Sequence, residues 1–157
     1  MARNCILQVE DDENDVFFLK RVFDQAGIDC PLHTVTDGET AINYLSGVGE
    51  LADRKAHPLP SLVLLDLKLP GKSGLEVLQW IRQQPELRKL VVVMFSSSAL
   101  EDDVERAYDF GANSYIEKPL NPSRLREIAQ LLKGWWLGYN HFPPIHQEWK
   151  DQLARPS

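Results

Sequence analysis

The sequence predicts an α/β fold in which a doubly wound sheet of five parallel strands carries helices on both faces. Two observations indicate this fold class. Short apolar or β-branched runs alternate with longer segments of helical period, which is typical of βαβ units. In addition, the run Val91–Phe95 is apolar at every position, as expected of a strand that helices cover on both faces. Such folds bind ligands at the carboxyl ends of their strands, near the point where strand order reverses.

The expected elements are short and alternate regularly. The strands are Cys5–Val9, Leu32–Val35, Leu62–Leu65, Val91–Phe95 and Ser114–Ile116. The helices are Val16–Ala26, Thr40–Leu45, Leu75–Arg82, Val104–Phe110 and Ser123–Leu132. Gly27 and Gly111 end the first and fourth helices, and Asn121-Pro122 opens the fifth. The long, charged connection Ser46–Pro60 is expected to be a surface insertion.

Composition limits the functional classes. The 157 residues suit one globular domain, with 43% hydrophobic and 25% charged residues. The net charge of −6 and the lack of a basic run argue against binding to nucleic acid or to an anionic membrane. The longest apolar run, Leu90–Phe95, is too short to span a bilayer, and the N-terminus does not resemble a signal peptide. With Cys5 and Cys30 expected as buried, reduced thiols, the sequence predicts a cytoplasmic protein.

Acidic side chains follow two of the expected strands. Glu10, Asp11 and Asp12 come directly after the first strand, and Asp66 follows the third. If these strands are neighbours, Glu10, Asp11 and Asp66 converge, and repulsion raises the pKa of at least one of them unless a cation intervenes. An oxygen-only ligand set favours a hard ion, so we expect Mg²⁺. Asp12 by itself is explained more simply as part of a helix N-terminus.

Donors for an anion follow two further strands. Ser96, Ser97 and Ser98 follow the fourth strand, and Lys118 follows the fifth. Taken singly, a serine there is usually a helix cap and a lysine is usually solvated. Together with a carboxylate and a divalent cation, they are the groups that in-line phosphoryl transfer onto Asp66 requires. The expected product is an acyl phosphate.

These residues resemble the receiver domains of two-component response regulators over residues 4 to about 133. The motifs that carry the resemblance are Val9–Asp12, Leu64–Gly71 with Gly74, Ser96, and Gly111–Pro119. The intervals of 30 residues from Asp66 to Ser96 and 22 from Ser96 to Lys118 also agree with that family. The resemblance implies a flavodoxin-like strand order of 2-1-3-4-5.

The resemblance also implies roles for individual residues. Asp66 would be the phosphoacceptor, Asp11 and Asp66 direct Mg²⁺ ligands, and Glu10 a ligand through water. Lys68 would contribute its backbone carbonyl to the metal. Lys118 would bind a phosphoryl oxygen, and the Lys118-Pro119 bond would be cis.

The family resemblance implies a conformational switch as well. Ser96 would bind the phosphoryl group and move with it, and Tyr115 would turn into the space that this movement opens. The surface made by the fourth helix, fifth strand and fifth helix would change as a result. Such a protein is not an enzyme in the usual sense, although it assists its own phosphorylation and dephosphorylation. A sensor histidine kinase would bind the first helix, where the candidates are Asn14, Asp15, Phe18 and Arg21.

The receiver domain is expected to end at residue 133, leaving 134–157 as an aromatic extension with no separate output domain. The extension contains Trp135, Trp136, Tyr139, Phe142 and Trp149. These side chains would either pack back onto the receiver domain or form an interface with a second copy or a partner. The insertion and the extension resemble those of single-domain regulators that serve phytochrome-type sensor kinases, many of which form homodimers.

Three other functions are conceivable for a protein of this fold class. A flavin-binding protein needs a glycine- and hydroxyl-rich phosphate loop after the first strand, where Glu10 and Asp11 would repel phosphate. A dehalogenase-type phosphatase carries a second aspartate two residues after its nucleophile, where this chain has Lys68. A phosphorylation-independent adaptor with a receiver fold is the remaining alternative.

Overall fold

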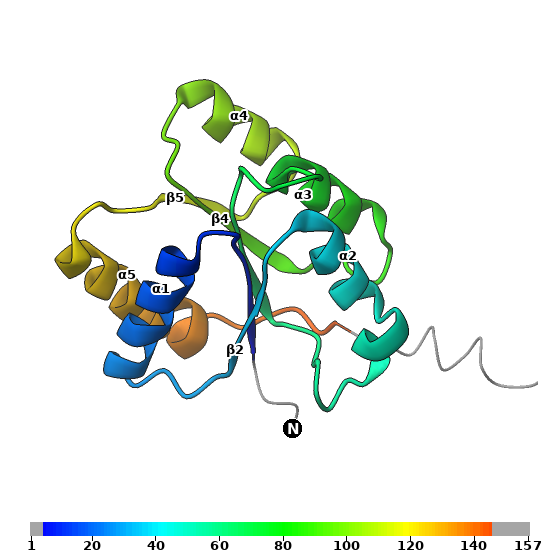
Figure 1. The fold of residues 1–157 in the computed structure, drawn as a ribbon, viewed down its shortest axis with the longest axis horizontal. Helices are drawn as coiled ribbons and strands as arrows, with labels where there is room; N and C mark the ends of the chain where they lie inside the picture. The colour runs from blue at the N-terminus through cyan, green and yellow to red at the C-terminus, as the bar shows by residue number, and fades with distance from the viewer. Residues whose placement is uncertain (1–4, 146–157) are drawn as a thin grey trace, which may run out of the picture.

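A parallel sheet forms the centre of the protein in the computed structural model, which describes residues 5–145 (Figure 1). Its strand order is β2-β1-β3-β4-β5, as expected. The strands are β1 (Ile6–Val9), β2 (Leu32–Val35), β3 (Leu62–Leu65), β4 (Val91–Ser96) and β5 (Ser114–Glu117). The expected strand ends differ from these by at most one residue, because each strand is an almost continuous apolar run between polar turns.

Within residues 5–145, five α-helices connect and flank the strands. They are α1 (Glu13–Gln25), α2 (Gly38–Ser46), α3 (Gly74–Gln83), α4 (Glu101–Asp109) and α5 (Pro122–Gly134). Helices α1 and α4 each begin three residues earlier than the apolar periodicity indicated. Their first turns are polar and acidic, so they carry no apolar signal, but negative charge is favourable at a helix N-terminus.

The helices cover both faces of the sheet. Helices α1 and α5 lie side by side on one face, and α2, α3 and α4 lie on the other (Figure 1). In β3, Leu62 and Leu64 pack toward α1 and α5, whereas Val63 and Leu65 pack toward the opposite face. This burial on both sides explains the unbroken apolar strands and confirms the predicted fold class.

The connection between α2 and β3 is attached to the domain rather than loose. It contains a short 3₁₀ helix, η1 (Gly49–Ala52). The Arg54 guanidinium donates to the backbone oxygens of Tyr44 (2.7 Å) and Leu45 (3.0 Å). In return, the Tyr44 hydroxyl donates to the Pro58 oxygen at 2.9 Å. The expected insertion is therefore held against the C-terminal end of α2.

Part of the aromatic extension packs back onto the receiver fold, and part of it is exposed. Helix α5 continues into a π-helical turn, η2 (Trp135–Tyr139). Trp136 stacks on Phe142 with ring centroids 6.3 Å apart, and both pack against the core on the α1 and α5 side. Trp135 and Tyr139 remain 61% and 82% exposed. Trp149 lies outside the described residues.

No helix within residues 5–145 is both long and apolar enough to cross a bilayer.

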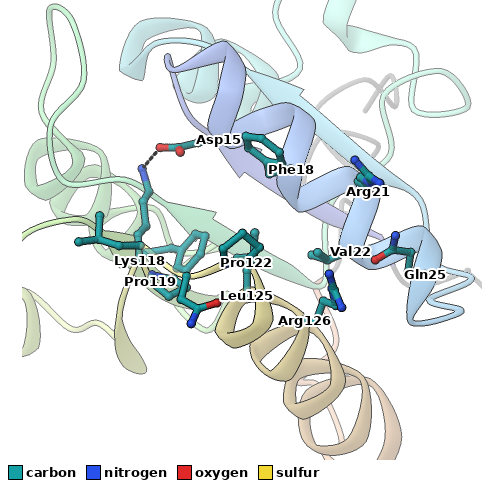
Figure 2. Close-up of a pocket in the computed structure, with 13 residues that line it drawn as sticks. Asp15, Phe18, Arg21, Val22, Gln25, Lys118, Pro119, Pro122, Leu125 and Arg126 are labelled. Atoms are coloured by element: carbon teal, nitrogen blue, oxygen red, sulfur yellow. Dashed lines mark hydrogen bonds and ion pairs between the residues drawn. The ribbon is translucent and has the colours of Figure 1, made fainter.

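A groove of about 420 Å³ lies between α1 and the N-terminal part of α5. Figure 2 shows Phe18 and Arg21 from α1 on one side and Pro122 and Leu125 from α5 on the other. Lys118 lies at one end of the groove, so the groove leads toward the carboxyl ends of the strands.

Gly74, the first residue of α3, sets how closely that helix approaches the end of β3. A Cβ atom at this position would lie only 2.0 Å from the Asp66 backbone oxygen. The Gly74 amide also donates to the Leu67 oxygen at 2.9 Å. Because the crowded atoms belong to the backbone, the chain cannot accept a side chain here without moving Asp66.

Replacing Gly74 by alanine is expected to reduce the free energy of unfolding by about 3 kcal/mol or more, because the new methyl group overpacks the backbone. The melting temperature, measured by circular dichroism, should fall by roughly 10 °C. Gly134→Ala is the control, since its Cβ would meet nothing within 4 Å in a helical backbone. That change should raise stability by about 0.5–1 kcal/mol. Equal stability of the two variants would contradict the packing assigned to Gly74.

Candidate functional site

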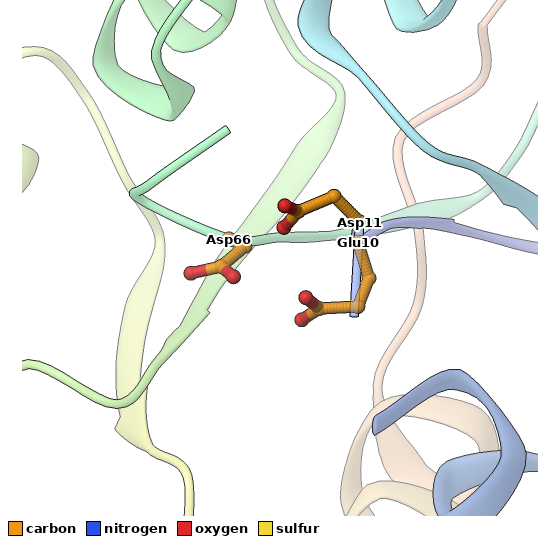
Figure 3. Close-up of side chains that lie close together, drawn as sticks. All are labelled: Glu10, Asp11 and Asp66. Atoms are coloured by element: carbon orange, nitrogen blue, oxygen red, sulfur yellow. The ribbon is translucent and has the colours of Figure 1, made fainter. Parts of the chain in front are cut away.

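Three carboxylates meet where the chain leaves β1 and β3. Strands β1 and β3 pair in register, Val9 beside Leu65, so the residues that follow emerge side by side. Glu10, Asp11 and Asp66 each place a carboxylate oxygen within 4.8 Å of the other two (Figure 3). The order of the strands reverses between β1 and β3, where the connections diverge and leave room for a ligand.

Burial makes this cluster electrostatically costly. Glu10 is only 2% exposed, and Asp66 is also buried, whereas Asp11 is exposed. Burial raises the pKa of Glu10 to about 7, although hydrogen bonds from Lys118 and the Asp12 amide oppose that rise. A divalent cation would neutralise the cluster, and carboxylate oxygens are suitable ligands for a hard ion. The donor set and its spacing therefore fit a divalent metal.

Lys118 supplies the positive charge of the site. Its ammonium donates to Glu10, to Asp66 Oδ2 at 2.9 Å and to Asp15 Oδ2 at 3.0 Å. Burial by itself lowers the pKa of Lys118, but the hydrogen bonds to Glu10 and Asp66 outweigh it and raise the pKa above the ordinary value. The Lys118 amide donates to the Ser96 oxygen at 2.8 Å, which fixes where the side chain leaves β5.

The expectation of a cis bond before Pro119 is wrong. None of the peptide bonds described for residues 5–145 is cis, so Lys118-Pro119 is trans. For a bond that precedes proline, the trans isomer is favoured by about 0.5–1 kcal/mol. With this trans bond, the Lys118 ammonium contacts Asp66 Oδ2 at 2.9 Å.

Ser96 is buried at the end of β4 and is linked to the loop that follows. The Ser98 amide donates to Ser96 Oγ at 3.3 Å, and the Ser98 hydroxyl donates to Asp103 of α4 at 2.6 Å. The Tyr115 hydroxyl donates to the Ser98 backbone oxygen at 2.8 Å. Tyr115 is half-buried and packs against the core under α2, α3 and α4. Ser98 thus joins the strand-end hydroxyl to both Tyr115 and α4.

The remaining sequence candidates have other surroundings. Asp12 is the N-cap of α1, because its carboxylate accepts from the amides of Asn14 (2.8 Å) and Asp15 (3.1 Å). Its interpretation as a helix N-terminus is confirmed. The Lys68 side chain is exposed, two residues after Asp66.

Asp15 has a contact that sequence reasoning missed. The sequence indicated Asp15 only as a candidate for kinase binding on the first helix, whereas the structure also pairs it with Lys118. The available signal was its position in the first turn after β1, since that turn begins at the same edge of the sheet.

Comparison with known proteins identifies the family. The model of the response regulator receiver domain matches residues 6–130. The chain belongs to the response regulator receiver family. It therefore functions in two-component signalling, in which receiver domains work with histidine kinases. The resemblance found in the sequence motifs is confirmed.

Relatives of known sequence or structure match most of this receiver chain. The probable methanogenesis regulatory protein FilR2 of Methanothrix harundinacea is 37% identical over 88% of this chain and 86% of its own. Response regulator Rcp1 of Synechocystis is 38% identical, covering 84% and 88%. Its Mn²⁺-bound crystal structure matches with a TM-score of 0.81, at 36% identity over 90% of this chain and 99% of that one. The phosphorylated cyanobacterial phytochrome response regulator RcpA has a TM-score of 0.84 and 36% identity, covering 91% and 100%.

Divalent-metal binding should weaken as pH falls below 7. Burial raises the pKa of Glu10 to about 7, so this carboxyl group is mostly protonated at pH 6 and mostly ionised at pH 8. Because a metal competes with that proton, the dissociation constant for Mn²⁺ should be about tenfold higher at pH 6 than at pH 8. Electron paramagnetic resonance of free Mn²⁺ measures it.

Glu10→Gln is the control for this titration. It should bind Mn²⁺ more weakly at pH 8 and lose most of the change between pH 6 and 8. A variant that keeps the full pH dependence would show that another group titrates.

Proposed function

We propose that Asp66 accepts a phosphoryl group from a sensor histidine kinase. The observation that carries this proposal is the contact of the Asp66 carboxylate with the Lys118 ammonium at 2.9 Å, inside a cluster that fits a divalent cation. An Asp66 oxygen attacks phosphorus, the phosphorus–nitrogen bond of the phosphohistidine breaks, and its electron pair returns to the imidazole. The product is an acyl phosphate on Asp66. We propose that the residues around Asp66 also assist the hydrolysis of this acyl phosphate, so that the chain would assist both its phosphorylation and its dephosphorylation.

We infer that the cation is Mg²⁺. Asp11 and Asp66 would bind it directly, Glu10 through a water molecule, and Lys68 through its backbone carbonyl. Oxygen-only ligands and the abundance of partly hydrated Mg²⁺ sites in phosphoryl transfer support this choice. When bound, the metal would neutralise negative charge on the phosphoryl oxygens. The Lys118 ammonium and the Ser96 hydroxyl would bind the same oxygens.

Phosphorylation would then alter the surface formed by α4, β5 and α5. Ser96 would move toward the phosphoryl group and pull on the loop through the Ser98 amide. The same loop holds the Tyr115 hydroxyl and the Asp103 carboxylate. A shift of Ser96 would therefore be passed to Tyr115 and α4 through the hydrogen bonds of Ser98, which supports Ser96 and Tyr115 as the switch residues.

The kinase would dock in the groove between α1 and α5. Any phosphohistidine that reaches Asp66 must come from a protein seated beside the strand ends, and the groove leads there (Figure 2). Exposed Phe18 and Leu120 provide apolar contacts, and Arg21 provides a charge. A phytochrome-type kinase is the proposed partner, on the likeness to RcpA. A histidine kinase uses cytoplasmic ATP, so the protein would meet it in the cytoplasm.

Phosphorylation of Asp66 is testable without the kinase. Incubation with acetyl phosphate and Mg²⁺ should add the mass of one phosphoryl group, as measured by intact-protein mass spectrometry. Asp66→Asn should abolish the addition, because an amide is a poor nucleophile. Asp29→Asn, in the exposed loop before β2, should remain like the wild type.

Failure of the wild type to gain mass, from acetyl phosphate or from a panel of phosphorylated kinases, would favour the phosphorylation-independent adaptor. Tandem mass spectrometry must also place the modification on residue 66. Modification elsewhere would contradict the proposed phosphoacceptor.

We also propose that the protein forms a homodimer through the end of α5 and η2. Leu131, Trp135 and Tyr139 follow one another at four-residue intervals and are all exposed. That spacing puts them along one side of a helical segment. Such a stripe can pair with its own copy in an isologous interface, and large aromatic side chains commonly dominate interface energies.

The dimer should depend on the exposed aromatic residues. Light scattering should give a dimer for the wild type at tens of micromolar and a monomer for the double variant Trp135→Ser, Tyr139→Ser. Val48→Ser removes another exposed apolar side chain, in the α2–β3 connection, and should leave the dimer intact. A monomeric wild type, or a double variant that stays dimeric, would refute this interface.

A further inference from the structure

Asp15 is a carboxylate of the site that lies outside the cluster fitted to a metal. That cluster comprises Glu10, Asp11 and Asp66. Asp15 instead faces Lys118, with 3.0 Å between Oδ2 and Nζ, and its side chain is 43% exposed. Its backbone is fixed, because the Asp15 amide donates to the carboxylate of the N-cap Asp12 at 3.1 Å. Asp15 is therefore held in place on the first turn of α1.

The three hydrogen bonds of Lys118 differ in how they respond to a ligand. An ammonium has three N–H donors, and here they go to Glu10, Asp66 and Asp15. The Lys118 side chain is only 11% exposed, so water has little access to it. Glu10 and Asp66 belong to the cluster that fits a divalent cation, so a cation bound there would compete with Lys118 for both. Asp15 is the partner that this competition spares.

We propose that Asp15 is a positioning residue that holds the Lys118 ammonium beside Asp66 during phosphorylation. This inference rests on the phosphoacceptor role proposed for Asp66. If Glu10 and Asp66 held a cation, the hydrogen bond to Asp15 would keep one N–H of Lys118 occupied and the ammonium in place. The N–H groups freed in this way would be available to the incoming phosphoryl oxygens. When the charge is already in position, the reaction does not have to include the entropy lost on ordering a flexible four-carbon side chain.

A role in kinase docking makes a different prediction for the same residue. Asp15 lines the groove with Phe18 and Arg21, so its removal could also disturb contacts with the kinase (Figure 2). Acetyl phosphate distinguishes the two roles, because this small donor needs no docking surface. A positioning residue affects both donors, whereas a docking residue affects only the kinase.

The test measures phosphorylation rates of Asp15→Ala, Asp15→Asn and Asp15→Glu with acetyl phosphate at saturating Mg²⁺. We expect the alanine and asparagine variants to react about tenfold more slowly than the wild type. Asp15→Glu retains the charge on the same turn and should recover at least half of the rate. Asp24→Asn, an exposed site near the end of the same helix, should match the wild type. Saturating Mg²⁺ removes any contribution from altered metal affinity.

A second measurement does not require phosphorylation. The side-chain ammonium of Lys118 should give a ¹H–¹⁵N signal protected from exchange in the wild type, and Asp15→Asn should weaken that protection while Asp24→Asn should not. Wild-type rates or faster rates in Asp15→Asn at saturating Mg²⁺, or an unchanged Lys118 signal, would overturn the positioning role. A wild type that is never phosphorylated but whose Lys118 signal depends on Asp15 would instead refute the proposed function of Asp66.

Discussion

The placement of the Lys118 ammonium among carboxylates from other elements is the interaction on which the site depends. Glu10 and Asp66 are buried, and two like charges at a few ångströms repel strongly when little water separates them. Lys118 offsets this repulsion through direct hydrogen bonds to both. Those bonds require β5 to end where its lysine can reach the ends of β1 and β3. The neutralisation of these carboxylates therefore depends on the order of the strands in the sheet.

The same balance explains why the site can respond to a ligand. A buried cluster with more negative than positive groups favours a cation, and a cation in turn favours an anionic phosphoryl group. Binding of the cation, and then of the phosphoryl group, would change the partners available to Lys118 and to Ser96. Because Ser98 connects Ser96 with Tyr115 and Asp103, the change has a short physical route to α4.

Close backbone packing provides the rigid frame for these charges. Helix α3 approaches β3 so closely that only glycine fits at position 74, and this contact lies against the Asp66 backbone.

In the aromatic extension, Trp136 and Phe142 pack against the core near α5, while Trp135 and Tyr139 stay on the surface. The extension therefore adds both stability and exposed apolar area to one helix.

The sequence by itself determined the layered fold, because continuous apolar strands and periodic helices specify burial on both faces before any contact is known. It also predicted that Glu10, Asp11 and Asp66 lie close together, since neighbouring parallel strands end at one edge of a sheet. Only the tertiary structure decided which atoms meet across that edge: Asp15 with Lys118, and Tyr115 with the Ser98 oxygen. It also decided that the bond before Pro119 is trans and which aromatic residues of the extension pack against the core. These outcomes depend on side-chain reach and on packing between residues distant in the chain, which local periodicity does not encode.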